Sequence, residues 1–249
     1  MAVINSQSNF RVLQWCKLKT KAGRDKQGLF LVEGYHLVQE AHRASCLAEL
    51  ITTEKNRPFD VPTHHVTYEV MEKISAMATP AKVMGICRQP QAGAQVLDAS
   101  GSGRVLLIDQ ITHPGNLGTI IRSAVAFGVD VMVLSKSVDE YNPKVIQATQ
   151  GMIFHLRIIK RDIAEAIAQL KTQGYQIIGT DVREGQDLRT IQPSSPKHAI
   201  IMGSEGEGVG DALLKLCDVT VNIKMNPTCE SLNVGVAASI MLFALGDRP

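Results

Sequence analysis

Apolar and polar residues are arranged along the second half of the chain so that strands and helices are predicted in turn. Residues 104–109 are almost continuously apolar, as expected for a strand buried on both faces of a sheet. Further strands are predicted at residues 131–134, 176–180, 199–202 and 219–223, and helices at 117–127, 163–171 and 232–245. Gly128 and Gly174 are expected to end the first two helices. This alternation predicts an α/β domain with a mostly parallel sheet and helices on both faces.

The first half of the chain has shorter elements. A basic helix and loop at residues 9–26 come first, and the pattern then predicts a strand at 28–32, a helix at 35–44, and strands at 47–52, 61–66 and 83–88. These elements indicate a small α/β domain. The stretch QPQAGAQVLDASGSGR that follows is typical of a linker. We therefore divide the chain into residues 1–90, a linker at 91–103, and residues 104–249.

Charge is nearly balanced over the 249 residues, with a net value of +2, so bulk charge indicates no polyanionic partner. Its distribution is more informative, because residues 1–26 contain one acid and six bases. The bases are Arg11, Lys17, Lys19, Lys21, Arg24 and Lys26. Such an excess fits contact with phosphates, and it equally fits a solvated terminus.

Cysteine usage and hydropathy predict a cytoplasmic protein. The five cysteines include no C-x-x-C pair, which argues against a metal site, a redox motif or a disulfide framework. The N-terminus has no apolar signal-peptide core. Residues 234–245 form the longest apolar stretch and are too short to cross a bilayer. We expect no membrane segment and no bound metal.

The segments that follow the predicted strands carry the candidate chemistry, because parallel α/β sheets bind ligands at the carboxyl ends of their strands. After the strand at 104–109, Pro114, Gly115 and Gly118 predict a turn, and Asn116 is a candidate helix cap. Arg122 lies in an apolar helix, where it needs an anionic or carbonyl partner. A structural salt bridge and a functional role both remain open for it.

Two later segments are also candidates. Residues 203–210 read GSEGEGVG, and glycines there allow a ligand to approach the backbone closely or an anion to bind its N–H groups. No Gly-Lys-Ser/Thr follows, so the segment is not a phosphate P-loop, and a flexible surface loop is the simpler interpretation. Ser231 is a candidate N-cap of the final helix.

Taken together and in order, these segments resemble the motifs of the SpoU (TrmH-like) family of SPOUT RNA methyltransferases. Asn116-Leu-Gly-Thr-Ile-Ile-Arg122, Gly203-Ser-Glu205-Gly-Glu-Gly208 and Ser231-Leu-Asn-Val-Gly235 resemble its three motifs. Gly235 stands where the family usually has serine, and Gln147 where it often has a basic residue. Residues 9–88, with Phe30-Leu-Val-Glu-Gly34, more weakly resemble the family's L30e-like substrate-binding domain.

The resemblance implies a trefoil-knotted α/β methyltransferase domain at residues 104–249, S-adenosylmethionine as cofactor, and a homodimer with the final helix in its interface. It also implies an RNA substrate, ribosomal rather than transfer RNA by analogy with the L30e-like domain. The implied cofactor-binding residues are Thr180, Gly203, Ser204, Glu205, Gly208, Ile223, Met225, Ser231, Leu232 and Asn233.

By the same resemblance, Arg122 faces the reacting ribose oxygen, and Asn116, Glu205, Ser231 and Asn233 orient it and the ribose. A guanidinium is a very weak acid and releases its proton reluctantly, so stabilisation of the developing alkoxide is favoured over general-base catalysis. Neither role is excluded.

Two other functions predict different residues. A non-catalytic RNA-binding protein on a methyltransferase scaffold predicts loss of the motif residues, yet Asn116, Arg122, Glu205 and Asn233 are all present. A dinucleotide-dependent oxidoreductase requires a Gly-x-Gly-x-x-Gly turn after its first strand, and the segment after Asp109 has no such turn.

Overall fold

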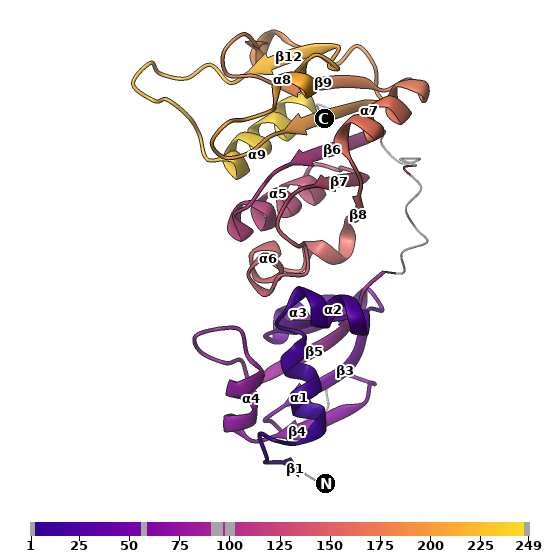
Figure 1. The fold of residues 1–249 in the computed structure, drawn as a ribbon, viewed down its shortest axis with the longest axis vertical. Coiled ribbons are helices and arrows are strands. Elements are labelled where there is room, and N and C mark those ends of the chain that lie inside the picture. The colour runs from indigo at the N-terminus through magenta and orange to yellow at the C-terminus, as the bar shows by residue number, and fades with distance from the viewer. Residues whose placement is uncertain (1–2, 56–58, 91–96, 98–102, 247–249) are drawn as a thin grey trace. The chain divides into compact units, whose positions relative to one another are not determined.

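The computed structural model describes residues 3–55, 59–90, 97 and 103–246. Contacts divide the chain into two units (Figure 1). Unit 1 contains residues 1–92 and 139–155, and unit 2 contains residues 93–138 and 156–249. The predicted limits at 1–90, 91–103 and 104–249 stay a prediction, and most of the 91–103 linker lies outside the described residues.

Unit 1 is built on a five-stranded mixed sheet in the order β1-β4-β3-β5-β2. Its strands are β1 (Val3–Ile4), β2 (Leu29–Glu33), β3 (Leu47–Thr52), β4 (Thr63–Val66) and β5 (Val83–Arg88). Strand β5 runs antiparallel to both of its neighbours, β2 and β3. The helices of the first 92 residues are α1 (Phe10–Lys17), α2 (Lys21–Gln27), α3 (Tyr35–Arg43) and α4 (Tyr68–Ile74). Trp15 of α1 and Met71 of α4 share one buried apolar cluster with strand residues such as Ile51.

A later segment of the chain completes unit 1. It contains α6 (Pro143–Thr149) and a 3-10 turn at Met152–His155. Asp139 forms a buried salt bridge with Arg24, and the rings of Tyr141 and Phe30 lie 4.6 Å apart. The sequence pattern places these residues with 104–249, whereas their contacts place them with the N-terminal sheet.

Unit 2 contains a seven-stranded sheet in the order β10-β12-β9-β11-β6-β7-β8, and every pairing within it is parallel. Its strands are β6 (Arg104–Asp109), β7 (Val131–Ser135), β8 (Arg157–Lys160), β9 (Gln176–Thr180), β10 (Gln186–Asp187), β11 (His198–Met202) and β12 (Val219–Asn222). The mostly parallel α/β sheet predicted from the sequence is therefore confirmed. The central strands are buried on both faces, which explains their continuous apolar runs.

The helices of unit 2 are α5 (Pro114–Ala126), α7 (Ile163–Thr172), α8 (Asp211–Leu214) and α9 (Val234–Leu245), with a 3-10 turn at Leu188–Thr190. Helix α7 packs into the main apolar cluster of the sheet. Helices α5 and α9 are joined by a hydrogen bond of 2.7 Å between the Ser123 and Ser239 hydroxyls. Gly128 follows α5 with φ +70°, as expected for the glycine that ends a helix.

Two predicted helix starts were wrong. Helix α5 begins at Pro114 rather than 117, because proline is well suited to the first helical position, and Asn116 lies inside the first turn instead of capping it. Helix α9 begins at Val234, and its N-cap is Asn233 rather than Ser231. The Asn233 side chain accepts hydrogen bonds from the backbone N–H groups of Gly235 and Val236.

Candidate active site

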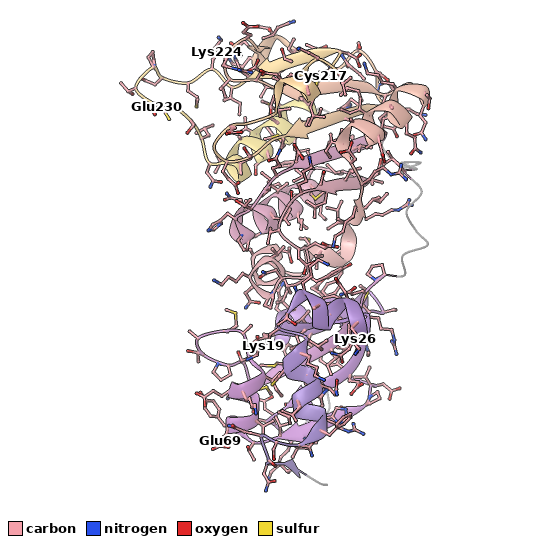
Figure 2. The ribbon with its side chains drawn as sticks, in the orientation of Figure 1. Lys19, Lys26, Glu69, Cys217, Lys224 and Glu230 are labelled. Atoms are coloured by element: carbon pink, nitrogen blue, oxygen red, sulfur yellow. The ribbon has the colours of Figure 1, made fainter. Side chains whose placement is uncertain are left out.

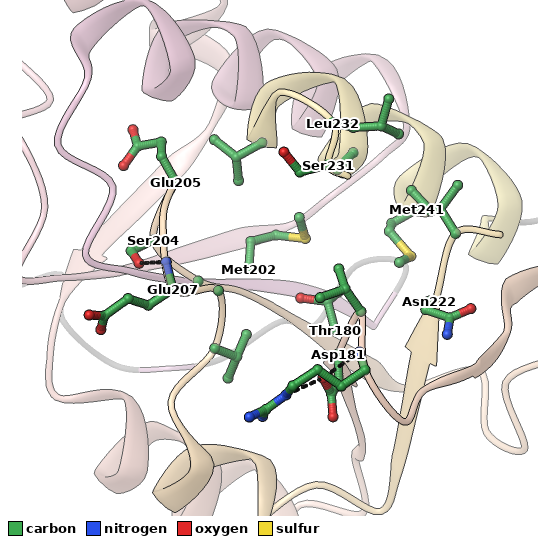
Figure 3. A pocket seen from close by; sticks show the side chains of 18 of the residues that line it. Thr180, Asp181, Met202, Ser204, Glu205, Glu207, Asn222, Ser231, Leu232 and Met241 are labelled. Atoms are coloured by element: carbon green, nitrogen blue, oxygen red, sulfur yellow. Dashed lines mark hydrogen bonds and ion pairs between the residues drawn. The ribbon is translucent and has the colours of Figure 1, made fainter. Parts of the chain in front are cut away.

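Loops after three neighbouring strands of unit 2 surround a cavity of about 360 Å³ (Figure 3). These loops follow the carboxyl ends of β9, β11 and β12, and the start of α9 forms the remaining wall. The lining residues are Thr180–Arg183, Met202–Val209, Val221–Ile223, Met225, Ser231, Leu232, Val234, Ala237 and Met241. Of the ten predicted cofactor-binding residues, all but Asn233 line this cavity.

The loop after β11 is closed by its own backbone. Ser204 and Gly208 exchange two backbone hydrogen bonds of 3.0 and 3.1 Å, and the Ser204 hydroxyl accepts a third from the N–H of Glu207 (Figure 3). A Cβ atom on Gly203 would lie 2.0 Å from the Gly208 carbonyl group. Glycine is therefore required at 203 by the loop itself, whereas the sequence suggested that a ligand would approach there.

A chain of hydrogen bonds connects the three sequence motifs. The Glu205 carboxylate accepts from the backbone N–H of His113 at 3.0 Å and from the Asn116 side-chain amide at 3.1 Å. The carbonyl oxygen of the Asn116 side chain accepts from the Asn233 side-chain amide at 2.9 Å. Because Asn233 also caps α9, this relay extends from the loop after β11 through α5 to the start of α9.

The charge of Glu205 sets the direction of the relay. Partial burial raises the pKa of the Glu205 carboxyl. Hydrogen bonds from the His113 N–H and the Asn116 amide outweigh this effect, so the pKa lies below its ordinary value. An ionised carboxylate only accepts hydrogen bonds, so Asn116 presents its NH₂ group to Glu205 and its oxygen to Asn233. Asn233 in turn directs its oxygen to the helix N–H groups.

The two other predicted catalytic residues lie outside this relay. Arg122 is exposed on α5 and does not line the cavity, and its side chain makes no hydrogen bond or ion pair within the described part of the chain. The structural salt bridge considered for it is therefore absent there. Ser231 lines the cavity, is exposed, and accepts a weak hydrogen bond from the Cys229 thiol through its carbonyl oxygen.

An ion-pair network at the edge of the cavity was not predicted from the sequence. Arg183 bridges Asp181, at 3.2 Å, and Asp211, at 2.8 Å, and so connects the loop after β9 to the start of α8. The Asp181 carboxyl is largely buried, which raises its pKa, but hydrogen bonds from the backbone N–H and side chain of Arg183 bring the net pKa below its ordinary value. An acid directly after a predicted strand is the signal that could have identified Asp181.

The six predicted RNA-binding residues of unit 1, of which Figure 2 labels Lys19 and Lys26, are not equivalent. Arg11, Lys17, Lys21 and Lys26 are exposed, and Lys19 is half-buried with its ammonium group on the Lys73 carbonyl. Arg24 is 2% exposed and donates to the Leu18 and Lys19 carbonyls besides its salt bridge with Asp139. Its side chain holds unit 1 together, so a phosphate contact is the wrong expectation for Arg24.

Neither a metal site nor a membrane span is found in the described regions. Among residues 3–55, 59–90, 97 and 103–246, no three His, Cys, Asp or Glu side chains are grouped as metal ligands. Within the same ranges, no helix has both the length and the apolar character needed to span a bilayer.

Comparisons with known proteins find matches to both parts of the chain. Residues 103–243 match the model of the SpoU rRNA methylase family, and residues 9–85 match that of the MRM3-like substrate-binding domain. The chain is 35% identical to a 23S rRNA (guanosine(2553)-2′-O)-methyltransferase of Bacillus subtilis, over 98% of this chain and 99% of the relative. It is 30% identical to an uncharacterized tRNA/rRNA methyltransferase of Synechocystis, over 98% of this chain and 93% of that protein. The solved structure of an rRNA methyltransferase from Sinorhizobium meliloti with bound S-adenosylmethionine superimposes with a TM-score of 0.88 at 26% identity, covering 98% of this chain and 96% of that one.

Proposed function

This chain belongs to the SpoU rRNA methylase family of RNA 2′-O-ribose methyltransferases, and we propose that it methylates a ribose 2′-hydroxyl of 23S ribosomal RNA. The enzyme class and the use of S-adenosylmethionine follow from the family. The choice of 23S rRNA over transfer RNA is supported by the Bacillus relative, which matches nearly the whole chain. The observation that carries the proposal is the Glu205–Asn116–Asn233 relay, which joins all three motifs beside the cavity.

Mapping of 2′-O-methylated nucleotides tests the substrate directly. We expect total RNA from cells that lack the protein to have lost one methylated ribose in 23S rRNA, at the position equivalent to the guanosine named in the Bacillus relative. Restoring the wild-type gene should restore that signal. Loss of a methyl group from a transfer RNA instead would contradict the choice of substrate, and an unchanged map would contradict the activity.

The cavity suits S-adenosylmethionine in size and in lining. Its volume lies within the usual range of small-molecule sites, about 300 to 1,000 Å³. Apolar side chains such as Met202, Leu232 and Met241 provide surface for an adenine ring (Figure 3). Asp181 is already paired with Arg183, so Glu205 and Glu207 provide the negative charge for the cofactor's cationic groups. The bound cofactor supplies an activated methyl group. We therefore assign the protein the tasks of binding the cofactor and orienting it and the ribose.

Asn222 provides a more specific fit. It is 6% exposed and lines the cavity, and its NH₂ group donates to the Gly185 carbonyl at 2.7 Å. Its Oδ1 atom is buried and has no hydrogen-bond partner among the described residues. A buried acceptor without a partner is costly, so a donor supplied by the ligand would stabilise the site. We propose that Asn222 accepts a hydrogen bond from the bound cofactor.

Replacing Gly203 by alanine tests whether the closed loop is needed for cofactor binding. The added Cβ would collide with the Gly208 backbone, and so the loop must open. We expect calorimetry to show that the dissociation constant for S-adenosylmethionine rises at least about tenfold, which corresponds to 1.4 kcal/mol. Gly210→Ala is the matched control, because a Cβ there has no neighbour within 4 Å. Tight binding by Gly203→Ala would remove the loop from the cofactor site.

The chemical difficulty lies with the nucleophile, because a ribose hydroxyl is a very weak acid. A guanidinium next to the oxygen would stabilise the negative charge that develops as the hydroxyl attacks. We assign this role to Arg122, whose exposed side chain has no partner within the described residues of its own chain. Asn116, Glu205 and Asn233 keep the surrounding loops in place, and Ser231 contributes a hydroxyl to the wall of the cavity.

A second copy of the chain is proposed to cover the outer face of α9. Val236, Ile240 and Phe243 are spaced to lie on one side of this helix, and they are 46%, 36% and 73% exposed. Phe127, which directly follows α5, adds a ring 5.8 Å from that of Phe243. An exposed apolar patch of this kind marks an interaction site. Since Arg122 does not line the cavity of its own chain, we propose that the dimer brings it to the partner's cavity.

Unit 1 is proposed to hold the RNA, in agreement with its match to a substrate-binding domain. Arg11, Lys17, Lys21 and Lys26 would contact phosphates, while Lys19 is partly engaged by the Lys73 carbonyl. The proposed substrate also places the enzyme in the cytoplasm.

A further inference from the structure

Three aromatic rings form an exposed cluster on unit 1, away from its core. Tyr35 and His42 lie two turns apart on α3, and Phe59 comes from the segment between β3 and β4. The Phe59 ring lies between them, 5.8 Å from the Tyr35 ring and 5.0 Å from the His42 ring. We refer to Tyr35, His42 and Phe59 as the aromatic platform.

Exposure distinguishes the platform from Trp15 and Phe30, and its ring contacts distinguish it from Phe10 and Tyr68, which are exposed but contact no other ring among the described residues. Trp15 is 5% exposed and Phe30 is 1% exposed, so their rings are explained by the core. Tyr35 is 53% exposed, His42 is exposed and Phe59 is half-buried. Three neighbouring rings that remain open to solvent provide a flat surface for another planar group.

The charge around the platform does not oppose a nucleic acid. All nine residues of α3 are described, and its exposed side chains are Tyr35, His36, His42 and Arg43, none of which is acidic. Arg43 is 61% exposed and uses one guanidinium nitrogen to donate to Glu40, at 2.6 Å. Because Arg43 is paired with Glu40, and the charges of Glu54, Lys55, Arg57 and Asp60 in the neighbouring segment cancel, the surroundings of the platform are close to neutral and do not repel a polyanion.

We propose that the aromatic platform binds an unpaired base of the substrate RNA by stacking. This inference rests on the proposed function. It adds a contact that recognises an unpaired base, whereas the lysines recognise the charge of the phosphate backbone. Single-stranded RNA is commonly recognised through bases that stack on aromatic side chains, with nearby cations on the phosphates. The lysines of α1 and α2 then supply the electrostatic part of binding, and the platform supplies a part that is independent of charge.

Binding of two RNA probes to the full-length protein separates these contributions. The first probe is a fluorescent single-stranded RNA dodecamer, and the second is the same strand annealed to its complement. We expect Tyr35→Leu to weaken binding of the single strand by about fivefold to a hundredfold, as expected when one base–aromatic stack is removed. Binding of the duplex should be unchanged, and Tyr35→Trp should restore single-strand binding.

Salt dependence gives a second readout. Stacking releases no counterions, so Tyr35→Leu should keep the wild-type slope of log affinity against log salt. A Lys17→Gln/Lys26→Gln variant should instead show a shallower slope, by roughly 0.7 for each phosphate that the protein no longer neutralises. Tyr68→Leu is the matched control, because Tyr68 is also the first residue of its helix and is 56% exposed.

The platform and the proposed function fail in different ways. If wild type methylates rRNA but Tyr35→Leu binds the single strand as tightly as wild type, the platform is excluded and its rings are left for a protein partner. Equal losses in Tyr35→Leu and Tyr68→Leu would also overturn it. A wild-type protein that binds the dodecamer but methylates no RNA would instead contradict the enzymatic proposal.

Discussion

Arg122→Ala is expected to lower single-turnover methyl transfer by at least about a hundredfold, the loss typical of removing one donor that stabilises a developing oxyanion. This selective loss of methyl transfer is expected from the position of the Arg122 side chain as well as from its positive charge. The side chain is exposed and makes no hydrogen bond or ion pair within the described residues, so its removal disrupts no polar interaction there. We therefore expect the melting temperature and the affinity for S-adenosylmethionine to stay near wild type.

Arg122→Lys separates charge from geometry. Lysine keeps the positive charge but lacks the planar guanidinium with its several donors, so it should recover little of the lost rate. The measurement is the rate of methyl transfer from labelled S-adenosylmethionine to saturating RNA in a single turnover, with calorimetry for cofactor affinity. Lys215→Ala, which removes an exposed cation near α8, is the control and should keep the wild-type rate. Near-normal transfer by Arg122→Ala would exclude the proposed mechanism, whatever the enzyme class.

The sheet of unit 2 could be predicted because its strands are buried on both faces. Continuous apolar runs such as Arg104–Asp109 and Val131–Ser135 need no tertiary information to be recognised. Strand β8, Arg157–Lys160, was missed because two charged residues flank only two apolar ones. Helix α6 was missed because it is seven residues long, and part of its apolar side is explained by contacts with β2, which is distant in the sequence. Those contacts join residues more than 100 positions apart, as in the salt bridge between Arg24 and Asp139.

Prediction of the active site was likewise limited by contacts between residues that are distant in the sequence. Asn116, Glu205 and Asn233 could be grouped from the sequence because the three motifs that contain them resemble those of one family. No local pattern could show that Asn116 bonds to residues 89 and 117 positions away, or that Asn233 rather than Ser231 caps α9. Ser231 and Asn233 are both good N-cap residues, so the choice depends on where the chain turns into the helix. The trefoil knot likewise remains an expectation from the family, since residue patterns carry no signal for chain threading.

Mixed dimers are expected to show that Arg122 serves the partner's cavity. We consider one chain with Arg122→Ala and the other with Gly203→Ala, assayed at an S-adenosylmethionine concentration too low to fill the weakened Gly203→Ala cavity, so that each is inactive as a homodimer. If Arg122 acts across the interface, the intact cavity of the first chain receives Arg122 from the second. A symmetric dimer has two equivalent sites, so this heterodimer should recover about half of the wild-type rate. If Arg122 acts within its own chain, both sites of the heterodimer lack one component and it stays inactive.

The reciprocal arrangement is the matched control. A wild-type chain is paired with a chain that carries both Arg122→Ala and Gly203→Ala, and differently tagged chains allow each heterodimer to be purified. Action across the interface leaves this pair inactive, because the wild-type cavity receives no Arg122 and the other cavity binds no cofactor. Action within one chain leaves it about half active, since the wild-type site is complete. An active control pair with an inactive first pair would therefore refute the exchange of Arg122, and a monomeric mass in solution would refute the dimer itself.

Since Val236, Ile240 and Phe243 form the proposed contact, Phe243→Glu should yield a monomer. This variant should also lose methyl transfer, even though every residue of its cavity is intact.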